Sequence, residues 1–359
     1  MNTSIGRREL LSRGLQSLGL CILPRTLKGS AESPPPLPSP PTLRLYTWAG
    51  YFKPELLSSF AADHDCRIQV STFGSNEELL VNLEADKNLY DLVTPSVYSI
   101  GMLRRGNLLS PLDPSMLANR QFIEKEHLNS TADPQNEWSV PFAFSVSGIG
   151  YLEGEHQPRL FSWRAFDEPL FYQRFTLLDD MREVLGAALK SLGKSVNCAS
   201  HSDLAAAQEV ADRWIKNARR LQSEDYRVNL TQEVDRLAHG YCGDFLHRSE
   251  RSVPAQFFIP EEGAPTTCDH FCLTANSENK RLAHEFINFF CLPHIAAQNM
   301  EWSGFRSAIG EARSMLPPTL REHPTLFPAP EILARCEPLQ DLGDSLPLYE
   351  KAWGQLVCG

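Results

Sequence analysis

Hydrophobic and polar positions follow two different periods over the first part of the folded body. Residues 43–48, 67–73 and 89–94 carry short apolar or alternating runs, which are typical of β-strands. Residues 53–64 and 75–86 repeat apolar positions every three to four residues, which predicts a helix after each of the first two strands. Strands and helices that alternate in this way form a parallel sheet with right-handed crossovers.

The same alternation returns later in the chain. Residues 174–192 have the pattern of a strand followed by an apolar helix. Residues 234–244 have the pattern of a strand that enters a glycine-rich turn, and residues 265–273 have the pattern of another strand. Residues 281–291 and 343–357 have the spacing of helices. This alternation of strands and helices predicts an α/β protein. The length of 359 residues, without an internal repeat, predicts about two domains.

The expected sheet places polar and aromatic side chains at one edge. Ligands of open α/β sheets bind beyond the carboxyl ends of the strands. Trp48 and Tyr51 follow the first strand, and Ser96 and Tyr98 follow the third. These residues either form a binding rim or pack in the core, and the pattern leaves both readings open. A dinucleotide site has no support, because no Gly-x-Gly-x-x-Gly motif follows the first strand.

Two carboxylates lie one helical turn apart where the helix after residue 178 begins. Asp180 and Glu183 have the N-cap and N3 spacing of a capping arrangement. The alternative is that both carboxylates face a cleft. Both interpretations can hold together, because a cap uses only one oxygen of each group.

Composition and charge narrow the classes of function. Hydrophobic residues make up 42% of the chain and charged residues 22%, as in globular proteins. The chain has no apolar run of roughly 18 residues, which excludes a bundle of membrane-spanning helices. The formal net charge of −10 offers no basic face for nucleic acid and suits a cationic partner.

The N-terminal segment has the features of an export signal. Arg7 and Arg8 give a positive start, and a weakly apolar stretch follows at residues 14–23, as in a twin-arginine signal. Small residues at 29–31 offer a cleavage point. We therefore expect residues 1–31 to direct export.

Proline dominates the next segment. Residues 32–41 include the run SPPPLPSPP, which predicts an extended polyproline linker. Cys21 could tether the protein to a membrane through a lipid, although the bulky Leu20 before it does not fit such a signal.

The cysteines do not form a metal-binding pattern. The chain has nine cysteines and no Cys-x-x-Cys pair, so we expect no structural zinc. In an exported protein some of them could pair, and the spacing leaves the pairing open.

Eight stretches match one family in order and spacing. Over roughly residues 42–357 the chain resembles the periplasmic spermidine/putrescine-binding proteins of polyamine ABC transporters. The matching stretches are LYTWAGYFKPELL, TFGSNEELLVNLEA, YDLVTPSVY, WSVPFAFSVSGIGY, LLDDMREVLGAALKSLG, AHGYCGD, IPEEGAP and LAHEFINFF.

The resemblance implies the α/β two-lobe fold of periplasmic binding proteins (type II-like), with the ligand cleft at the hinge between the lobes. Each lobe is then discontinuous. Residues 42–142 plus 268–306 would form the first lobe, and residues 143–267 plus 307–359 the second.

The resemblance also implies a set of ligand-binding residues. Aromatic faces would cover the methylene stems of a polyamine, and carboxylates would meet its ammonium groups. The matching positions are Trp48, Tyr51, Ser96, Tyr98, Asp180, Glu183, Ser223, Tyr241, Asp244, Asp269 and Phe305.

Three positions depart from the family pattern. Gly50 stands where the family usually has an acid, Thr267 stands where it has a tryptophan, and Leu339 falls near a family glutamine. We therefore expect a wider and less complementary pocket.

These observations predict a receptor that binds putrescine or spermidine in the periplasm and delivers it to an ABC permease. We expect a monomer without a cofactor, a metal, a nucleic-acid partner or catalytic activity. A receptor of the same fold for another amine or an amino acid is an alternative that Gly50 and Thr267 favour. A hydrolase is the alternative from another class, because Cys268 and His270 would share one face of a strand.

Overall fold

The computed structural model describes residues 40–152, 161–223, 226–232, 234–246 and 255–358. The expected export signal, Cys21 and the expected linker up to residue 39 lie outside the described residues. In the described part of the chain, no helix is both long and apolar enough to cross a membrane. Residues Pro40–Gly359 form one unit by their contacts, and this unit contains the whole sheet.

The first strands form the predicted parallel sheet. β1 (Thr42–Trp48) pairs in parallel with both β2 (Arg67–Phe73) and β3 (Leu92–Val93). α1 (Pro54–Asp63) and α2 (Asn76–Ala85) make the crossovers between them. The βαβαβ prediction is confirmed. β3 is shorter than the strand expected over residues 89–94, because only Leu92 and Val93 pair with β1.

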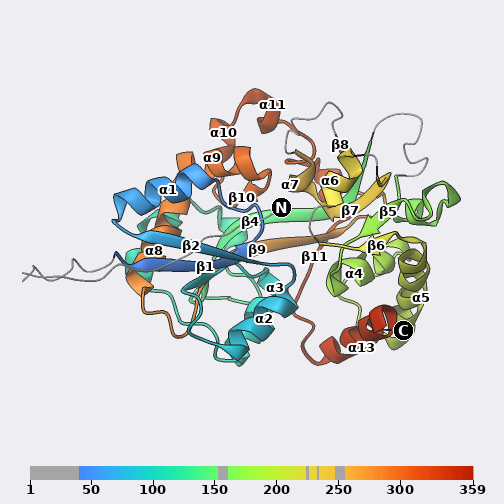
Figure 1. Ribbon diagram of the computed structural model, residues 1–359, viewed down its shortest axis with the longest axis horizontal. Helices are drawn as coiled ribbons and strands as arrows, with labels where there is room; N and C mark the ends of the chain where they lie inside the picture. The colour runs from blue at the N-terminus through green and yellow to red at the C-terminus, as the bar shows by residue number, and fades with distance from the viewer. Residues whose placement is uncertain (1–39, 153–160, 224–225, 233, 247–254, 359) are drawn as a thin grey trace, which may run out of the picture. The chain divides into compact units, whose positions relative to one another are not determined.

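Two antiparallel strands join this part of the sheet to the rest (Figure 1). β4 (Ser139–Leu152) pairs with β9 (Pro265–Leu273), and β9 pairs with β3. On its other side β4 pairs with β7 (Leu237–Tyr241), which is parallel to β5 (Phe175–Leu177). The order is β2-β1-β3-β9-β4-β7-β5-β6. The remaining strands are β6 (Arg220–Leu221), β8 (Ala255–Phe258), β10 (Arg306–Ser307) and β11 (Glu337–Pro338).

The other helices follow or cover these strands. They are α3 (Val97–Arg105), α4 (Met181–Ser191), α5 (His201–Asn217), α6 (Tyr226–Thr231), α7 (Cys242–Leu246), α8 (Lys280–Phe290), α9 (Pro293–Ser303), α10 (Ala312–Met315), α11 (Pro318–Arg321), α12 (Pro330–Leu333) and α13 (Leu346–Cys358). Short 3₁₀ helices lie in the connections at Pro114–Met116, Ala118–Phe122, Lys125–His127, Trp163–Asp167, Pro169–Phe171 and Gly343–Ser345.

One predicted turn is a helix instead. The strand expected over residues 234–244 ends at Tyr241, and α7 begins at the next residue without a glycine-rich loop. The two glycines that suggested a turn serve close packing. A methyl group on Gly240 would lie 2.3 Å from the ring of Tyr226, and one on Gly243 would lie 2.7 Å from the ring of Phe305.

Two large hydrophobic cores lie under different parts of the sheet. The first is built around the rings of Phe52, Phe142, Phe271, Phe286 and Phe290, and the Phe286 and Phe290 centroids lie 4.7 Å apart. It also includes residues after position 306, from Ala308 to Leu326. The second is built around Trp163, Phe166, Phe175 and Trp214. Two cores agree with the expected two-lobe α/β fold, whereas the exact lobe boundaries stay a prediction.

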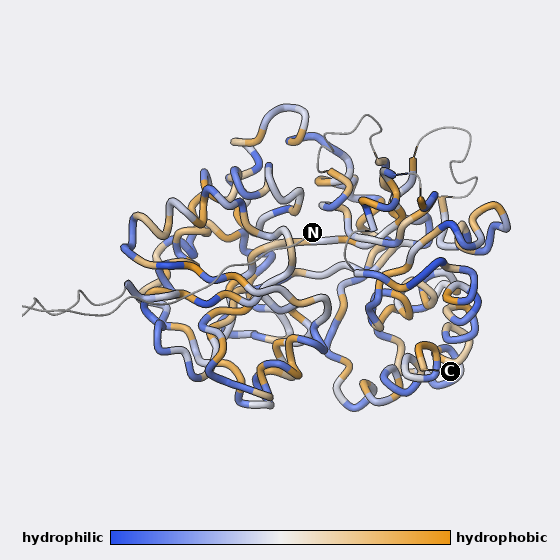
Figure 2. Tube along the Cα trace, viewed as in Figure 1, coloured by the Kyte–Doolittle hydropathy of each residue, from blue (hydrophilic) through white to orange (hydrophobic). Residues whose placement is uncertain are grey.

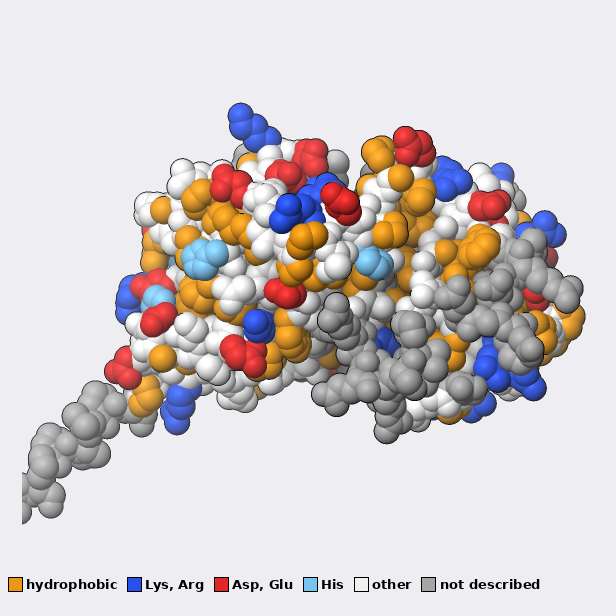
Figure 3. Space-filling model, turned by 90° about the horizontal axis from the view of Figure 1, so that it is seen from above, with side chains coloured by type: hydrophobic (Ala, Val, Ile, Leu, Met, Phe, Trp, Pro, Cys, Tyr) orange, Lys and Arg blue, Asp and Glu red, His pale blue; other side chains and the backbone are white. Residues whose placement is uncertain are grey.

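Hydrophobic and hydrophilic residues alternate along the outer helices, as expected for helices with one face on a core (Figure 2). On the face drawn in Figure 3, the coloured lysines and arginines lie among acidic side chains.

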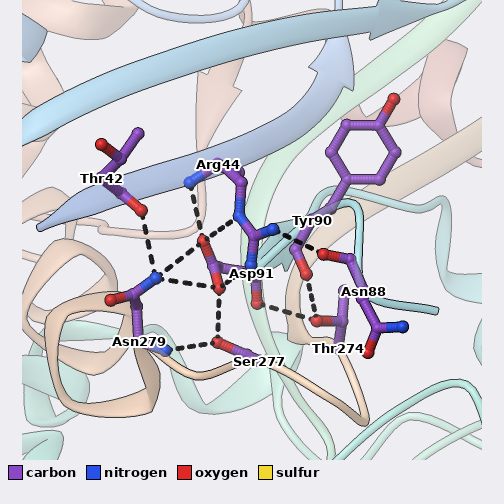
Figure 4. Close-up of polar contacts among 8 residues, drawn as sticks. All are labelled: Thr42, Arg44, Asn88, Tyr90, Asp91, Thr274, Ser277 and Asn279. Carbon is purple, nitrogen blue, oxygen red and sulfur yellow. Dashed lines mark hydrogen bonds and ion pairs between the residues drawn. The ribbon is translucent and has the colours of Figure 1, made fainter. Parts of the chain in front are cut away.

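A buried carboxylate ties together the amino ends of the first strands (Figure 4). Asp91 precedes β3 and is fully buried. The Arg44 guanidinium of β1 donates to both Asp91 oxygens at 3.0 Å, and Ser277 Oγ donates to Oδ1 at 2.9 Å. Burial alone would raise the pKa of Asp91, but these hydrogen bonds outweigh burial and lower the pKa. The network fixes β1 and β3 against the segment before α8, so their carboxyl ends have fixed positions.

Candidate functional site

A cavity of about 280 Å³ opens at the carboxyl ends of β1 and β3 and beside β9 and α7. This is the edge of the sheet where ligands are expected. Of the residues predicted to bind a ligand, those that line the cavity are Trp48, Tyr51, Ser96, Ser223, Tyr241, Asp244, Asp269 and Phe305. The other lining residues are Ala49, Phe73, Gly74, Ser145, Tyr226, Arg227, Val228 and Thr267.

Asp269 is held by two side-chain hydroxyls from other parts of the chain. It lies in β9 with only 2% of its surface exposed. Ser96 Oγ donates to Oδ1 at 2.6 Å, and the Tyr51 hydroxyl donates to Oδ2. Burial raises the pKa of Asp269 to about 6, while both hydrogen bonds act in the opposite direction. The carboxylate is therefore positioned but still has free lone pairs for a cation.

Asn76, which the sequence pattern did not identify, positions Ser96. Asn76, the first residue of α2, is buried, and its Oδ1 accepts a hydrogen bond from the Ser96 backbone N–H at 3.0 Å. Its Nδ2 donates to Ser96 Oγ at 3.2 Å and to the Tyr98 hydroxyl at 2.8 Å. The available signal was the spacing of Asn76 with Leu79 and Leu83, which form the buried face of the same helix.

The second carboxylate of the cavity has a similar arrangement. Asp244 is partly buried in α7, and the Tyr226 hydroxyl of α6 donates to its Oδ2. Burial raises the pKa of Asp244 to about 6, whereas the Tyr226 hydrogen bond and the nearby charge of Arg227 lower it. Tyr226 and Arg227 were not predicted to line the site. They lie on α6, a short helix that does not directly follow one of the predicted strands.

Aromatic rings form the walls between the two carboxylates. The Trp48 and Phe73 rings meet edge to face with centroids 4.5 Å apart, and the Tyr51 and Phe305 centroids lie 5.1 Å apart. Such faces suit methylene chains and cations. The ring of Phe305 rests against Gly243, where a side chain would occupy its space.

The three departures from the family pattern have different surroundings. Gly50 adopts a left-handed backbone (φ 71°), and a methyl group there would meet nothing within 4 Å. Thr267 lines the cavity, and its buried Oγ1 has no hydrogen-bond partner among the described residues. Leu339 is buried beside Tyr98 and Val196, away from the cavity lining. Of the three positions, only Thr267 lines the cavity, and a wider pocket stays a prediction.

Tyr98, Asp180 and Glu183 do not line the cavity. Asp180 is the N-cap of α4, and its Oδ1 accepts from the backbone N–H groups of Arg182 at 2.8 Å and Glu183 at 3.0 Å. The capping interpretation is confirmed. The Arg182 guanidinium packs 5.1 Å from the Tyr98 ring centroid and donates to a side chain and a carbonyl elsewhere.

This buried group has an excess of carboxylates. Burial and the charge of Asp180 raise the pKa of Glu183 to about 8 and that of Glu77 to about 7. Glu183 is 2% exposed, and its Oε2 has no hydrogen-bond partner among the described residues. Protonation or a nearby cation would reduce the repulsion among these carboxylates.

The residues of the hydrolase alternative have other partners. His270 is buried, which lowers its pKa to about 3, and its Nδ1 lies 3.0 Å from Ser139 Oγ. The Cys268 thiol points to a backbone carbonyl at 3.8 Å, and burial raises its pKa well above the usual value. Both shifts disfavour a thiolate–imidazolium pair.

The described cysteines form no disulfide, and one acidic cluster outside the cavity has a cationic partner. The eight described cysteines are free thiols. Glu124, Glu126 and His127 come close enough to hold a metal ion, but Arg306 already lies among them, with Nη2 3.0 Å from Glu124 Oε2. The chain's own guanidinium therefore balances this acidic group.

Comparison with known proteins agrees with the geometry. Residues 55–328 match the family described as bacterial extracellular solute-binding protein. The chain is 29% identical to the spermidine/putrescine-binding periplasmic protein of Salmonella typhimurium, over 89% of this chain and 92% of that protein. It is 28% identical to the putrescine-binding periplasmic protein PotF of Escherichia coli, over 89% of this chain and 92% of that protein. The TpPotD lipoprotein of Treponema pallidum has a similar structure, with a TM-score of 0.75 and 28% sequence identity. The match covers 88% of this chain and 99% of that chain.

Proposed function

The chain belongs to the bacterial extracellular solute-binding protein family, and on that premise we propose that it is a receptor for a polyamine, putrescine or spermidine, which it delivers to the permease of an ABC transporter. The family consists of receptors and not of enzymes. The relatives with matching chains are named for binding spermidine and putrescine.

The observation that carries the proposal is the pairing of two carboxylates with aromatic walls in one cavity. Asp244 and Asp269 each have a tyrosine hydroxyl as a fixed partner and lone pairs left for an ammonium group. Trp48, Tyr241 and Phe305 supply apolar surface for the methylenes between the charges. A ligand with ammonium groups at both ends of a short aliphatic chain fits this arrangement.

The proposal includes location and assembly. Export across the inner membrane by the segment 1–31 would place the receptor in the periplasm, where its relatives are named as working. Cys21 would then be a possible lipid tether. The receptor would act as a monomer, without a cofactor, and would close its two lobes on the ligand before docking on the permease.

Calorimetric titration of the purified protein tests the proposal. Putrescine and spermidine should bind with heat that saturates at one ligand per chain, and small-angle scattering should report a smaller radius of gyration with saturating ligand. Glucose and glutamate, which lack ammonium groups at two ends, are the control ligands. Absence of binding by every polyamine, in a protein that is folded by circular dichroism, would overturn the proposal.

A further inference from the structure

One face of the β4–β9 pair carries two hydroxyl side chains beside Asp269. Thr267 and Asp269 lie two positions apart on β9, so their side chains leave the same face of the strand. Ser145 on β4 is the cross-strand partner of Thr267, and both residues line the cavity. Side chains of directly opposite residues are neighbours on one face of a sheet. Thr267 and Ser145 therefore form a hydroxyl pair next to the carboxylate.

The hydroxyl of Thr267 has unused hydrogen-bonding capacity. Thr267 is 8% exposed, and its Oγ1 is buried without a hydrogen-bond partner among the described residues. Oγ1 and the methyl group both branch from Cβ on the cavity side of β9, and rotation about the Cα–Cβ bond exchanges their places. A buried hydroxyl that meets only methylenes weakens binding, whereas a ligand group that donates or accepts supplies the missing hydrogen bond.

The charges near the hydroxyl pair restrict the kind of ligand group that can bind to it. A carboxylate there would be repelled by Asp269, two residues along the same strand. A further ammonium group would need an acid of its own. The acids among the described lining residues are Asp244 and Asp269, and the two ends of a diamine already occupy them. A neutral hydroxyl, which both donates and accepts, matches Thr267 and Ser145 without a counter-charge.

We infer that Thr267 and Ser145 are specificity-determining residues that select a diamine with a hydroxyl group on its chain, beside the carbon whose ammonium group Asp269 holds. This inference rests on the proposed polyamine function and narrows its ligand. Plain putrescine presents only methylenes to the hydroxyl pair and leaves Thr267 Oγ1 unpaired. A site that hydrogen-bonds a ligand hydroxyl discriminates against the analogue without it, because its own buried polar groups then stay unpaired.

Calorimetric titrations of the full protein test the inference, with putrescine and hydroxyputrescine, its derivative with one hydroxyl group on the second carbon, as the main probes. Wild type should bind hydroxyputrescine about tenfold more tightly than putrescine. Thr267→Val keeps the β-branched shape and removes the hydroxyl, so it should bring the two affinities within about threefold of each other by weakening hydroxyputrescine alone. Ser145→Ala removes the other hydroxyl and should lower the ratio as well. Thr319→Val on the exposed surface of α11 is the matched control and should leave the ratio unchanged.

Each other result has a distinct meaning, and spermidine and ornithine complete the set of probes. Equal affinities in wild type, a ratio that neither variant changes, or an equal loss of both ligands in Thr267→Val overturns the hydroxyl selection and leaves the polyamine function intact. Spermidine that binds more tightly than hydroxyputrescine, with the advantage lost in Thr267→Val, assigns the hydroxyl pair to a third ammonium group and overturns the inference. The same result with ornithine assigns the pair to a carboxylate and also overturns it. Failure of every amine to bind to folded wild type overturns the proposed function itself.

Discussion

Tyr51 donates a hydrogen bond to Asp269 across 218 positions of sequence, from the loop after β1 to the middle of β9. Tyr226 and Asp244 repeat this relationship on the other side of the cavity. Each carboxylate thus accepts from a tyrosine hydroxyl, and Asp269 accepts from Ser96 Oγ as well, so neutral donors keep both carboxylates in place without cancelling their charge. The paired carboxylates are pre-organised for a cation, because the protein orients them before the ligand arrives.

Replacing Asp269 with asparagine should separate binding from stability. Asp269→Asn keeps the side-chain shape but removes the charge, so the loss of a charge-assisted hydrogen bond should weaken polyamine binding by about ten- to a hundredfold. The melting temperature should change little, since the hydroxyls of Ser96 and Tyr51 can rotate to pair with the amide. Calorimetry and thermal unfolding on one preparation measure both quantities.

The control for that variant is Asp63→Asn, which removes the same charge from the exposed end of α1. It should leave affinity unchanged. If Asp269 instead serves to cap nearby amides, its replacement should leave the affinity normal and lower the melting temperature. That pair of results would show that Asp269 is structural.

Polyamine affinity should fall on acidification near pH 6 and not near pH 4, where free carboxyls titrate. Burial raises the pKa of both Asp244 and Asp269 to about 6, and each must be ionised to pair with an ammonium group. Two such groups predict a loss of about a hundredfold between pH 7 and pH 5. Titrations across this range measure it, and an affinity that stays constant down to about pH 4 would exclude the two-carboxylate site.

Glu183 should make the ligand-free protein less stable as pH rises. Its pKa is raised to about 8 in the fold, so the folded state holds a proton that the unfolded chain releases near pH 4. Stability is therefore greatest at acidic pH on this account and falls as pH rises toward 8. Glu183→Gln mimics the protonated form and should raise the unfolding free energy by roughly 4 kcal/mol at pH 8, and by less than about 1 kcal/mol at pH 5.

Urea unfolding of wild type and Glu183→Gln at the two pH values measures this difference. Glu350→Gln on the exposed surface of α13 is the control and should show no pH-dependent gain. An equal effect of Glu183→Gln at both pH values would mean that hydrogen bonding, and not the buried charge, explains the result.

Gly243 should be required for the shape of the cavity wall. In Gly243→Ala the new methyl group would lie 2.7 Å from the Phe305 ring, which must move. Overpacking of this kind typically costs about 1–3 kcal/mol in stability, and the shifted ring should weaken polyamine binding as well. Gly354→Ala is the matched control, because a methyl group in that part of α13 meets nothing within 4 Å. Equal behaviour of the two variants, by thermal unfolding and calorimetry, would contradict this assignment.

The first strands and helices, and half of the residues that line the cavity, could be predicted from the sequence alone. The ranges 67–73 and 265–273 match β2 and β9 to the residue, because both runs are rich in the β-branched and aromatic residues that favour strands. The rule that ligands bind at the carboxyl ends of strands placed Trp48, Tyr51 and Ser96 at the cavity. These conclusions depend on neighbours along the chain, which a sequence shows directly.

Contacts between groups that are distant in sequence could not be predicted in this way. Asn76 reaches Ser96, and Tyr226 reaches Asp244, through contacts between separate elements that no local spacing encodes. Asp180 and Glu183 matched the family's acids, yet packing around α4 buries them outside the cavity lining, while Arg227 enters it from α6. The exposure and charge environment of a side chain depend on the elements that fold against it, so they follow from the packing of the whole chain and not from residue type or spacing.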